Sequence, residues 1–127
     1  GATALSFALR DTGADDELNI YAGVGTAFAN FWIYNVPFTP SESSWTTFEV
    51  PLVDDGNWVR IIGNGTLADT FANSNRLLIR HDGLGTPSQQ PERIAGDFGI
   101  DNVTLLPTPG ALGAFGIASL AFARRRR

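Results

Sequence analysis

Apolar and polar residues alternate along short segments of this chain, and that alternation restricts its fold more than any other feature. Leu5, Phe7 and Leu9 alternate with Ser6 and Ala8, which is the period of a strand with one buried face. Clusters of Gly, Pro, Asp, Asn and Ser separate such segments. We expect strands at residues 4–10, 18–22, 28–34, 47–52, 58–62, 76–82 and 97–105. Short strands with turn signals between them predict an all-β protein, an antiparallel β-sandwich.

One short helix and one irregular strand interrupt this pattern. Thr66 precedes Asp69 by a spacing in which hydroxyl and carboxylate satisfy the free N–H groups at a helix start. Leu67 and Phe71 share one helix face, so we expect one or two helical turns there. Around residues 101–102 the apolar phase of the last strand shifts, which predicts a β-bulge.

The composition is that of one folded domain. The chain has 127 residues, of which 43% are hydrophobic and 17% are charged, enough apolar content for a core. The chain contains no Met, and its first residues already have the pattern of a strand. We therefore expect it to be an N-terminally incomplete piece of a longer precursor.

The charges divide the chain into an acidic body and a basic end. All 9 basic residues are arginines, and the last four positions hold four of them, against 13 acidic residues in all. Residues 1–123 therefore carry 5 arginines and 13 acidic side chains, a balance of −8. Affinity for a phosphate backbone needs clustered Lys and Arg, so nucleic acid is not an expected partner. The absence of Cys excludes disulfides and thiolate chemistry.

The C-terminal end has the composition of a sorting signal. Pro107, Thr108 and Pro109 are followed by an uncharged stretch, residues 110–123, and then by Arg124, Arg125, Arg126 and Arg127. The stretch is shorter than the roughly 20 residues of a stable transmembrane helix. Arginines that stay on the cytoplasmic side would leave the body outside. The alternative is a final helix packed on the domain.

This tripartite end resembles the PEP-CTERM sorting signal of exported bacterial proteins, although Thr108 stands where that motif usually has Glu. The resemblance implies processing by an exosortase, transient insertion in the inner membrane, and release to the cell surface or an exopolysaccharide matrix. We assign residues 106–127 to this anchor segment and expect its apolar part to be a helix outside the domain. Truncation after Leu105 is expected to leave the thermal transition of the body nearly unchanged.

The body resembles the laminin B domain, also called laminin IV type A. The resemblance rests on short apolar motifs in the family's order, at residues 5–10, 45–52, 58, 77–80 and 99–103. It implies a jelly-roll sandwich over residues 1–105, found in extracellular matrix proteins and not associated with catalysis. It also implies that the family's N-terminal strand or strands are missing.

No catalytic constellation emerges from the sequence. His81 is the only histidine, no nucleophile motif accompanies it, and we interpret it as a polar residue at a strand end. The carboxylates at residues 15–17 and 54–55 are adjacent turn residues. Glycosidases need two carboxylates on opposite sides of a cleft, so we interpret these as solvated hairpin charges.

Calcium is the metal that the sequence favours, because hard oxygen ligands are plentiful. Jelly-roll carbohydrate-binding modules, which the body resembles at the level of the fold, often hold a structural calcium with an Asp on the last strand. Asp101 occupies that place and Asp97 is nearby, so these two are the candidate ligands. The alternative is that Asp101 and Asn102 simply cap a bulge.

The aromatic segment at residues 28–34 offers a candidate glycan site. Trp32 and Tyr34 share one face of this strand, and Phe31 and Ile33 share the other. If Phe31 and Ile33 pack inward, Trp32 and Tyr34 form a platform on which sugar rings stack. The alternative is that both faces are covered. Two other tryptophans flank the strand at residues 47–52 and are interpreted as structural: Trp45 and Trp58.

These observations favour a non-catalytic, exported module of a bacterial surface or matrix protein. Its expected role is adhesion or association with extracellular polysaccharide or a surface protein. The alternative is a carbohydrate-binding accessory module of a secreted polysaccharide-degrading enzyme, which an upstream hydrolase domain would reveal. A third hypothesis, that the domain is itself an esterase or glycosidase, requires hydrolysis that an Asp or His variant abolishes.

Overall fold

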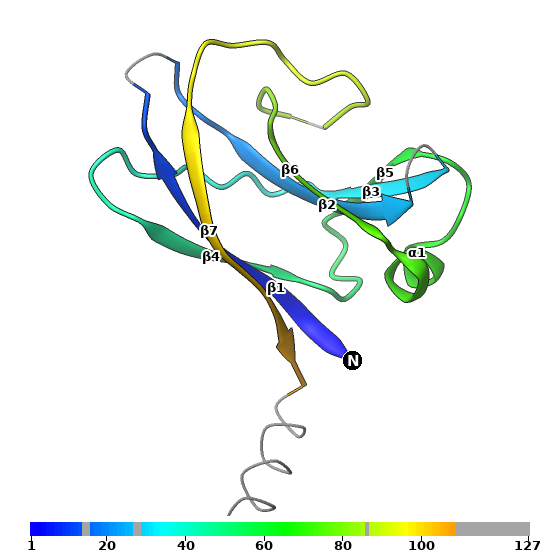
Figure 1. The fold of residues 1–127 in the computed structure, drawn as a ribbon. Coiled ribbons are helices and arrows are strands. Elements are labelled where there is room, and N and C mark those ends of the chain that lie inside the picture. Colours follow the sequence, from blue (N-terminus) through cyan, green and yellow to red (C-terminus); the bar gives the residue numbers. More distant parts are fainter. Residues whose placement is uncertain (14–15, 27–28, 86, 109–127) are drawn as a thin grey trace, which may run out of the picture.

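Two antiparallel sheets pack as a sandwich in the computed structural model, which describes residues 1–108 apart from 14–15, 27–28 and 86 (Figure 1). Sheet A has the order β4-β1-β7, and sheet B has the order β5-β3-β2-β6. The elements are β1 (Ala2–Asp11), β2 (Ile20–Thr26), β3 (Asn30–Tyr34), β4 (Thr46–Pro51), β5 (Trp58–Ile62), α1 (Leu67–Asn73), β6 (Arg76–His81) and β7 (Phe98–Pro107). The predicted antiparallel β-sandwich with one short helix is confirmed.

The main core lies between the two sheets. Leu5, Phe7 and Leu9 of β1 point inward and are at most 3% exposed, as their alternation predicts. Phe7 packs edge-on against Phe38, with ring centroids 5.6 Å apart. The other buried members of this cluster are Leu18, Ile20, Ala22, Tyr34, Val50, Trp58 and Leu67.

Sheet B is apolar on its outer face as well. Tyr21, Phe31 and Ile33 form a second buried cluster there, with Ile61, Ile62 and Leu78 packed around them. This explains why residues 31–34 of β3 form a continuous apolar run in the sequence, since alternation is lost where both faces of a strand are covered. The outer face of sheet A, by contrast, carries small and polar residues on its central strand, Ser6 and Ala8.

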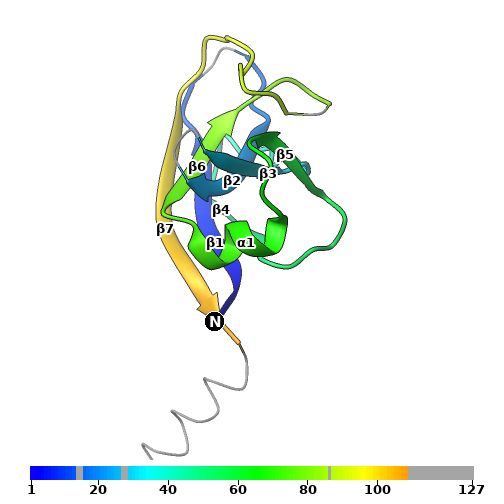
Figure 2. The same cartoon turned by 90° about the vertical axis from the view of Figure 1, so that its right-hand side faces the viewer.

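Helix α1 closes one end of sheet B (Figures 1 and 2). Thr66 is its N-cap: its Oγ1 accepts from the N–H of Asp69 at 3.1 Å and donates to the Asp69 carboxylate at 2.7 Å. Leu67 is buried, and Phe71 lies edge-on to Trp58 at 5.1 Å. The predicted capping pair and apolar helix face are confirmed. Among the described residues, no helix has the length and apolar character needed to cross a membrane.

Strand β7 contains the predicted bulge. Between the pairs Ser6–Thr104 and Ala8–Asp101, one residue of β1, Phe7, lies opposite two residues of β7, Asn102 and Val103. Asn102 has a φ of 53°. After the bulge, β7 continues to Pro107, two residues beyond the expected end of the domain. The hydroxyl of Thr108 donates to the Gly1 carbonyl.

We predict that position 102 requires a residue that tolerates a positive φ, and that this is the contribution of Asn102 to stability. Asn and Gly tolerate positive φ, whereas Ala costs about 1 kcal/mol or more in this region. Asn102→Ala should lower the free energy of unfolding in urea by about 1 kcal/mol, and Asn102→Gly by less than about 0.5 kcal/mol. Asn64→Ala is the matched control, because Asn64 is exposed and has no positive φ. Equal losses in Asn102→Ala and Asn64→Ala would contradict the prediction.

Candidate functional site

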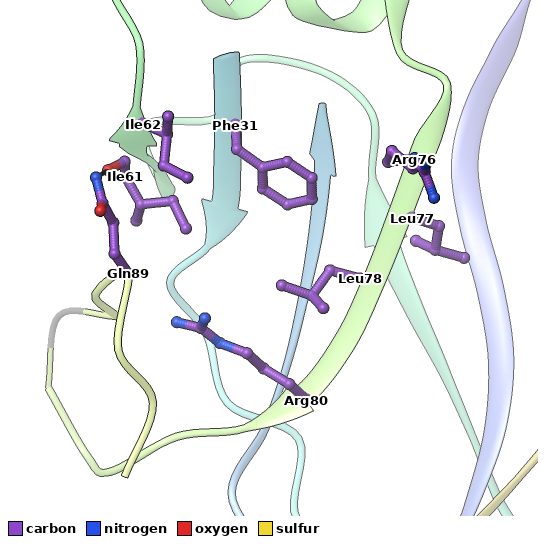
Figure 3. Close-up of a pocket in the computed structure, with 8 residues that line it drawn as sticks. All are labelled: Phe31, Ile61, Ile62, Arg76, Leu77, Leu78, Arg80 and Gln89. Carbon is purple, nitrogen blue, oxygen red and sulfur yellow. Dashed lines mark hydrogen bonds between the residues drawn. The ribbon is translucent and has the colours of Figure 1, made fainter. Parts of the chain in front are cut away.

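The outer face of sheet B carries a hollow of about 360 Å³ (Figure 3). Its walls come from β3, β5, β6 and the loop that follows β6, and we call it the sheet B hollow. The lining residues are Phe31, Ile61, Ile62, Arg76, Leu77, Leu78, Arg80 and Gln89. It therefore combines an apolar floor with two guanidinium groups and one amide, which is the composition expected of a ligand site.

The hollow depends on two glycines of β2. Gly23 and Gly25 alternate with inward-facing residues, so both lie on the outer face, where side chains would otherwise fill the space. A Cβ on Gly23 would come within 2.8 Å of the Phe31 ring and 2.9 Å of Ile33. A Cβ on Gly25 would come within 2.6 Å of the Phe31 ring. Phe31 thus lies against bare β2 backbone. The Gly-x-Gly spacing was the available sequence signal for this site.

Two arginines of β6 supply the polar part of the hollow. Arg80 reaches across it from β6 toward Gln89 (Figure 3), and its Nη2 donates to Asp82 at 2.9 Å and to the Ser88 carbonyl. Its Nε is buried and has no hydrogen-bond partner among the described residues. Arg76 is exposed. Gln89 donates to the Ile61 carbonyl at 2.9 Å and so ties the loop after β6 to β5.

Asp82 holds this arrangement together, and sequence reasoning missed it. The residue is only 7% exposed, and its carboxylate accepts from the N–H groups of Gly83, Ser88 and Glu92 as well as from Arg80. Burial favours the neutral acid, but the three N–H donors and the Arg80 charge outweigh it and lower the pKa of Asp82. The ionised carboxylate therefore fixes both the loop after β6 and the direction of Arg80.

His81 has the structural surroundings that its interpretation as a strand-end residue predicted. It is the last residue of β6, and its Nδ1 accepts from the N–H of Asn19 at 3.1 Å. Its Nε2 lies 3.3 Å from the Glu92 carboxylate. Both ring nitrogens thus contact groups that join β6 to neighbouring loops.

The predicted stacking platform on Trp32 and Tyr34 is wrong, because this face of β3 looks into the sandwich. Tyr34 is 8% exposed, lies 5.3 Å from the Trp58 ring, and donates its hydroxyl to Asp55 at 2.8 Å. Trp32 packs against the same core, and the Arg60 guanidinium lies 5.8 Å from its ring. The alternative that both faces are covered is the one observed, since sheet A covers one face and the Phe31 cluster occupies the other.

The structure does not bring Asp97 and Asp101 together as a calcium site. Asp97 directly precedes β7, and Asp101 lies about 10 Å along the extended strand from its first residue. Two ligands of one ion each need to lie about 2.5 Å from it. Asp101 instead accepts from the N–H of Asn102 at 2.7 Å, as the bulge alternative predicted. In the described part of the chain, no three His, Asp or Glu side chains form a metal-binding group.

The turn carboxylates and the other tryptophans are also placed. Asp54 and Asp55 each accept from a backbone N–H two residues ahead, as turn residues do, and Asp15 lies outside the described residues. Trp58 is structural as expected: it is 6% exposed and donates to the Pro51 carbonyl at 3.2 Å. Trp45 differs, because it is 49% exposed.

Most of the predicted sorting signal falls outside the described residues. Pro107 ends β7 and Thr108 follows it. The other predicted signal residues are not described: Pro109, Arg124, Arg125, Arg126 and Arg127.

Comparisons with protein families, with curated proteins and with solved structures find no match to this chain.

We predict a specific pH dependence for Asp82. Because folding lowers the pKa of Asp82 below its ordinary 3.8, the ionised group stabilises the fold above that pH, and this stabilisation disappears as pH falls through the folded-state pKa. Asp82→Asn should lower the free energy of unfolding at neutral pH by about 1–3 kcal/mol. The difference from the unmodified protein should shrink in acid below the ordinary value. Urea unfolding across pH measures both, with Asp54→Asn in an exposed turn as control.

Proposed function

We propose that this chain is a non-catalytic module of an exported bacterial surface or matrix protein, and that it associates with extracellular polysaccharide. The sheet B hollow is the observation that carries the proposal. Its walls are rigid strands, and its apolar floor and polar rim occur side by side. A jelly-roll topology of the laminin B type is part of the same proposal, supported by the two packed antiparallel sheets.

The chemistry of the hollow suits a sugar with a carboxylate. Sugar rings have apolar C–H faces and polar edges, and Phe31, Leu78 and Ile61 offer apolar surface beside hydrogen-bond donors. Arg76 and Arg80 lie on the same strand, four residues apart. Arg80 is paired with Asp82, whereas exposed Arg76 forms no ion pair among the described residues and supplies a positive charge at this edge of an acidic body. Guanidinium groups bind carboxylates through paired, charge-assisted hydrogen bonds. A uronate-containing polysaccharide is therefore the ligand class we assign to this site.

The C-terminal segment completes the proposal. The Pro-Thr-Pro motif, the uncharged stretch and the four arginines support export, transient insertion in the inner membrane and processing by an exosortase-type enzyme. The 14 residues of the uncharged stretch, 110–123, are too few for a permanent transmembrane helix, which needs roughly 20. The module would then be released to, or attached at, the cell surface or the extracellular matrix.

The same hollow also favours one alternative. A carbohydrate-binding accessory module of a secreted polysaccharide-degrading enzyme would need the same combination of apolar floor and polar rim. The full open reading frame distinguishes the two, because a hydrolase domain on the same polypeptide would favour the accessory module.

We predict that the full chain is retarded in affinity gels containing alginate, a polymer of uronates, and less in gels containing neutral dextran. Arg76→Gln should weaken the alginate interaction about tenfold, since a hydrogen bond to a charged group is worth about 1.5–3 kcal/mol. Added salt should weaken binding further. Arg93→Gln is the control, because Arg93 is exposed but does not line the hollow. Equal retardation of both variants would place binding elsewhere, and no retardation in either gel would favour adhesion to a protein.

The sorting proposal has its own test. Residues 106–127, fused to an exported reporter, should be found first in the inner membrane and later be released in cells that contain an exosortase. Replacing the four C-terminal arginines by Ala should abolish membrane retention, because the cytoplasmic charges hold the segment in place. Cell fractionation and reporter size on gels measure both steps. Release without any membrane stage in the unmodified fusion would contradict the proposal.

A further inference from the structure

A second exposed surface lies on the outer face of sheet A, on the opposite side of the sandwich from the hollow. Trp45, which directly precedes β4, is 49% exposed. Its indole extends toward β7, where a Cβ on Gly99 would come within 2.7 Å of the Cη2 atom at its tip. Gly99 pairs with Arg10 of the central strand, so the ring reaches across sheet A. Trp45 is thus a large aromatic group held in position while about half of its surface remains open.

The strands beside Trp45 form a low, polar surface. Ser6 and Ala8 point outward from β1, because Leu5, Phe7 and Leu9 point into the core. Directly paired residues share a face of the sheet. Glu49 of β4 pairs with Ser6, and Asp101 of β7 pairs with Ala8. Ser6 is partly exposed and Ala8 is only 5% exposed, so these small residues form the floor of a strip between two rows of polar side chains. We call this surface the sheet A ledge: Ser6, Trp45, Glu49 and Asp101.

The ledge has a negative charge. Glu49 and Asp101 are both exposed and lie on opposite sides of the strip. Arg10 is the one basic residue of β1, and its pairing with Gly99 places it beside the Trp45 ring. Its Nε donates to the Glu42 carbonyl at 3.4 Å. Neither carboxylate forms an ion pair within the described part of the chain. An aromatic ring with a carboxylate on each side of the adjoining strip is complementary to a ligand with both flat apolar faces and positive charges.

We propose that the sheet A ledge is a second glycan site, specific for an amino-sugar polymer whose amines are free and protonated. A sugar ring stacks on Trp45, and its neighbours along the polymer place their ammonium groups against Glu49 and Asp101. The proposal extends the proposed polysaccharide association to a second site with the opposite charge preference. The proposal does not depend on the arginines of the sheet B hollow, so glycan binding at each of the two sites can be tested separately.

Calorimetric titration of the full chain with a short glucosamine oligomer tests the proposal, at mildly acidic pH where the ligand is charged. The N-acetylated oligomer of the same length is the matched ligand, because it keeps the sugar faces and loses the charges. We expect the free-amine oligomer to bind at least several-fold more tightly. Trp45→Ala should weaken its binding on the order of tenfold, in line with aromatic stacking plus lost burial.

Three further variants separate the parts of the ledge. Glu49→Gln and Asp101→Asn should each weaken binding of the free-amine oligomer a few-fold and leave the acetylated oligomer unaffected. Gly99→Ala should displace the tip of the Trp45 ring and weaken both ligands. Arg76→Gln, in the sheet B hollow, should change neither. Urea unfolding of each variant checks that the fold is retained. Glu49 and Asp101 are exposed, so their variants still test the site if Gly99→Ala is unstable.

Two results would overturn the proposal. Unchanged binding in Trp45→Ala would show that the ring does not contact the glycan. Equally tight binding of the acetylated and free-amine oligomers would show that the carboxylates do not select the ligand. If either result is obtained but the full chain still binds alginate, only the sheet A ledge proposal fails, and the proposed function of the sheet B hollow stands.

Discussion

Strand β2 is buried on both of its faces, and the arrangement of the other strands follows from this. Ile20 and Ala22 face the sandwich core, and Tyr21 faces the outer cluster, with each at most 1% exposed. Strand β2 lies between β3 and β6, so each of these neighbours also places at least one apolar side chain on the outer face of sheet B. Sheet A can cover only the inner face. The outer face must therefore be covered by its own side chains, which is the packing role of Phe31 and Leu78.

The same requirement explains how the sheet B hollow arises without a deep cleft. If β2 carried side chains at Gly23 and Gly25, the outer cluster would be filled and flat. The two glycines allow the Phe31 ring to pack directly against the β2 backbone. The surrounding aliphatic side chains then form the walls of the hollow around it. The loop after β6, held by Asp82, closes one side and aims Arg80 across the opening. Packing and hydrogen bonding thus define one site together.

Local patterns predicted the elements of this fold because their causes are local. Alternation in β1, the cap at Thr66 and the phase shift near Asn102 each depend on a few neighbouring residues. The face of β3 was not determined in this way, since Phe31 and Trp32 are both large and apolar and both faces of the strand are covered. The choice depends on which side sheet A occupies, and that is a long-range property of the chain.

The candidate sites were hard to predict for a related reason. Asp82 resembles any Asp that follows a strand, and its importance comes from N–H donors up to ten residues away. Trp45 resembles a structural tryptophan until its contact with Gly99, on a strand more than fifty positions later, is known. Only the Gly23 and Gly25 spacing was a signal within one segment, because two glycines on one strand face indicate a close approach by another group.

The proximity of Gly1 and Thr108, the first and last described residues of the sandwich, has a mechanical consequence. β1 and β7 are antiparallel neighbours, Ala2 pairs with Pro107, and the Thr108 N–H lies 3.3 Å from the Gly1 carbonyl (Figure 1). A pull applied between Gly1 and Thr108 loads the ladder from one side, so its hydrogen bonds separate one after another rather than all at once. A force applied between Thr108 and sheet B instead passes through the packed core between the two sheets, where many contacts share the load. The sandwich should therefore resist this second direction of pulling better than the separation of Gly1 from Thr108.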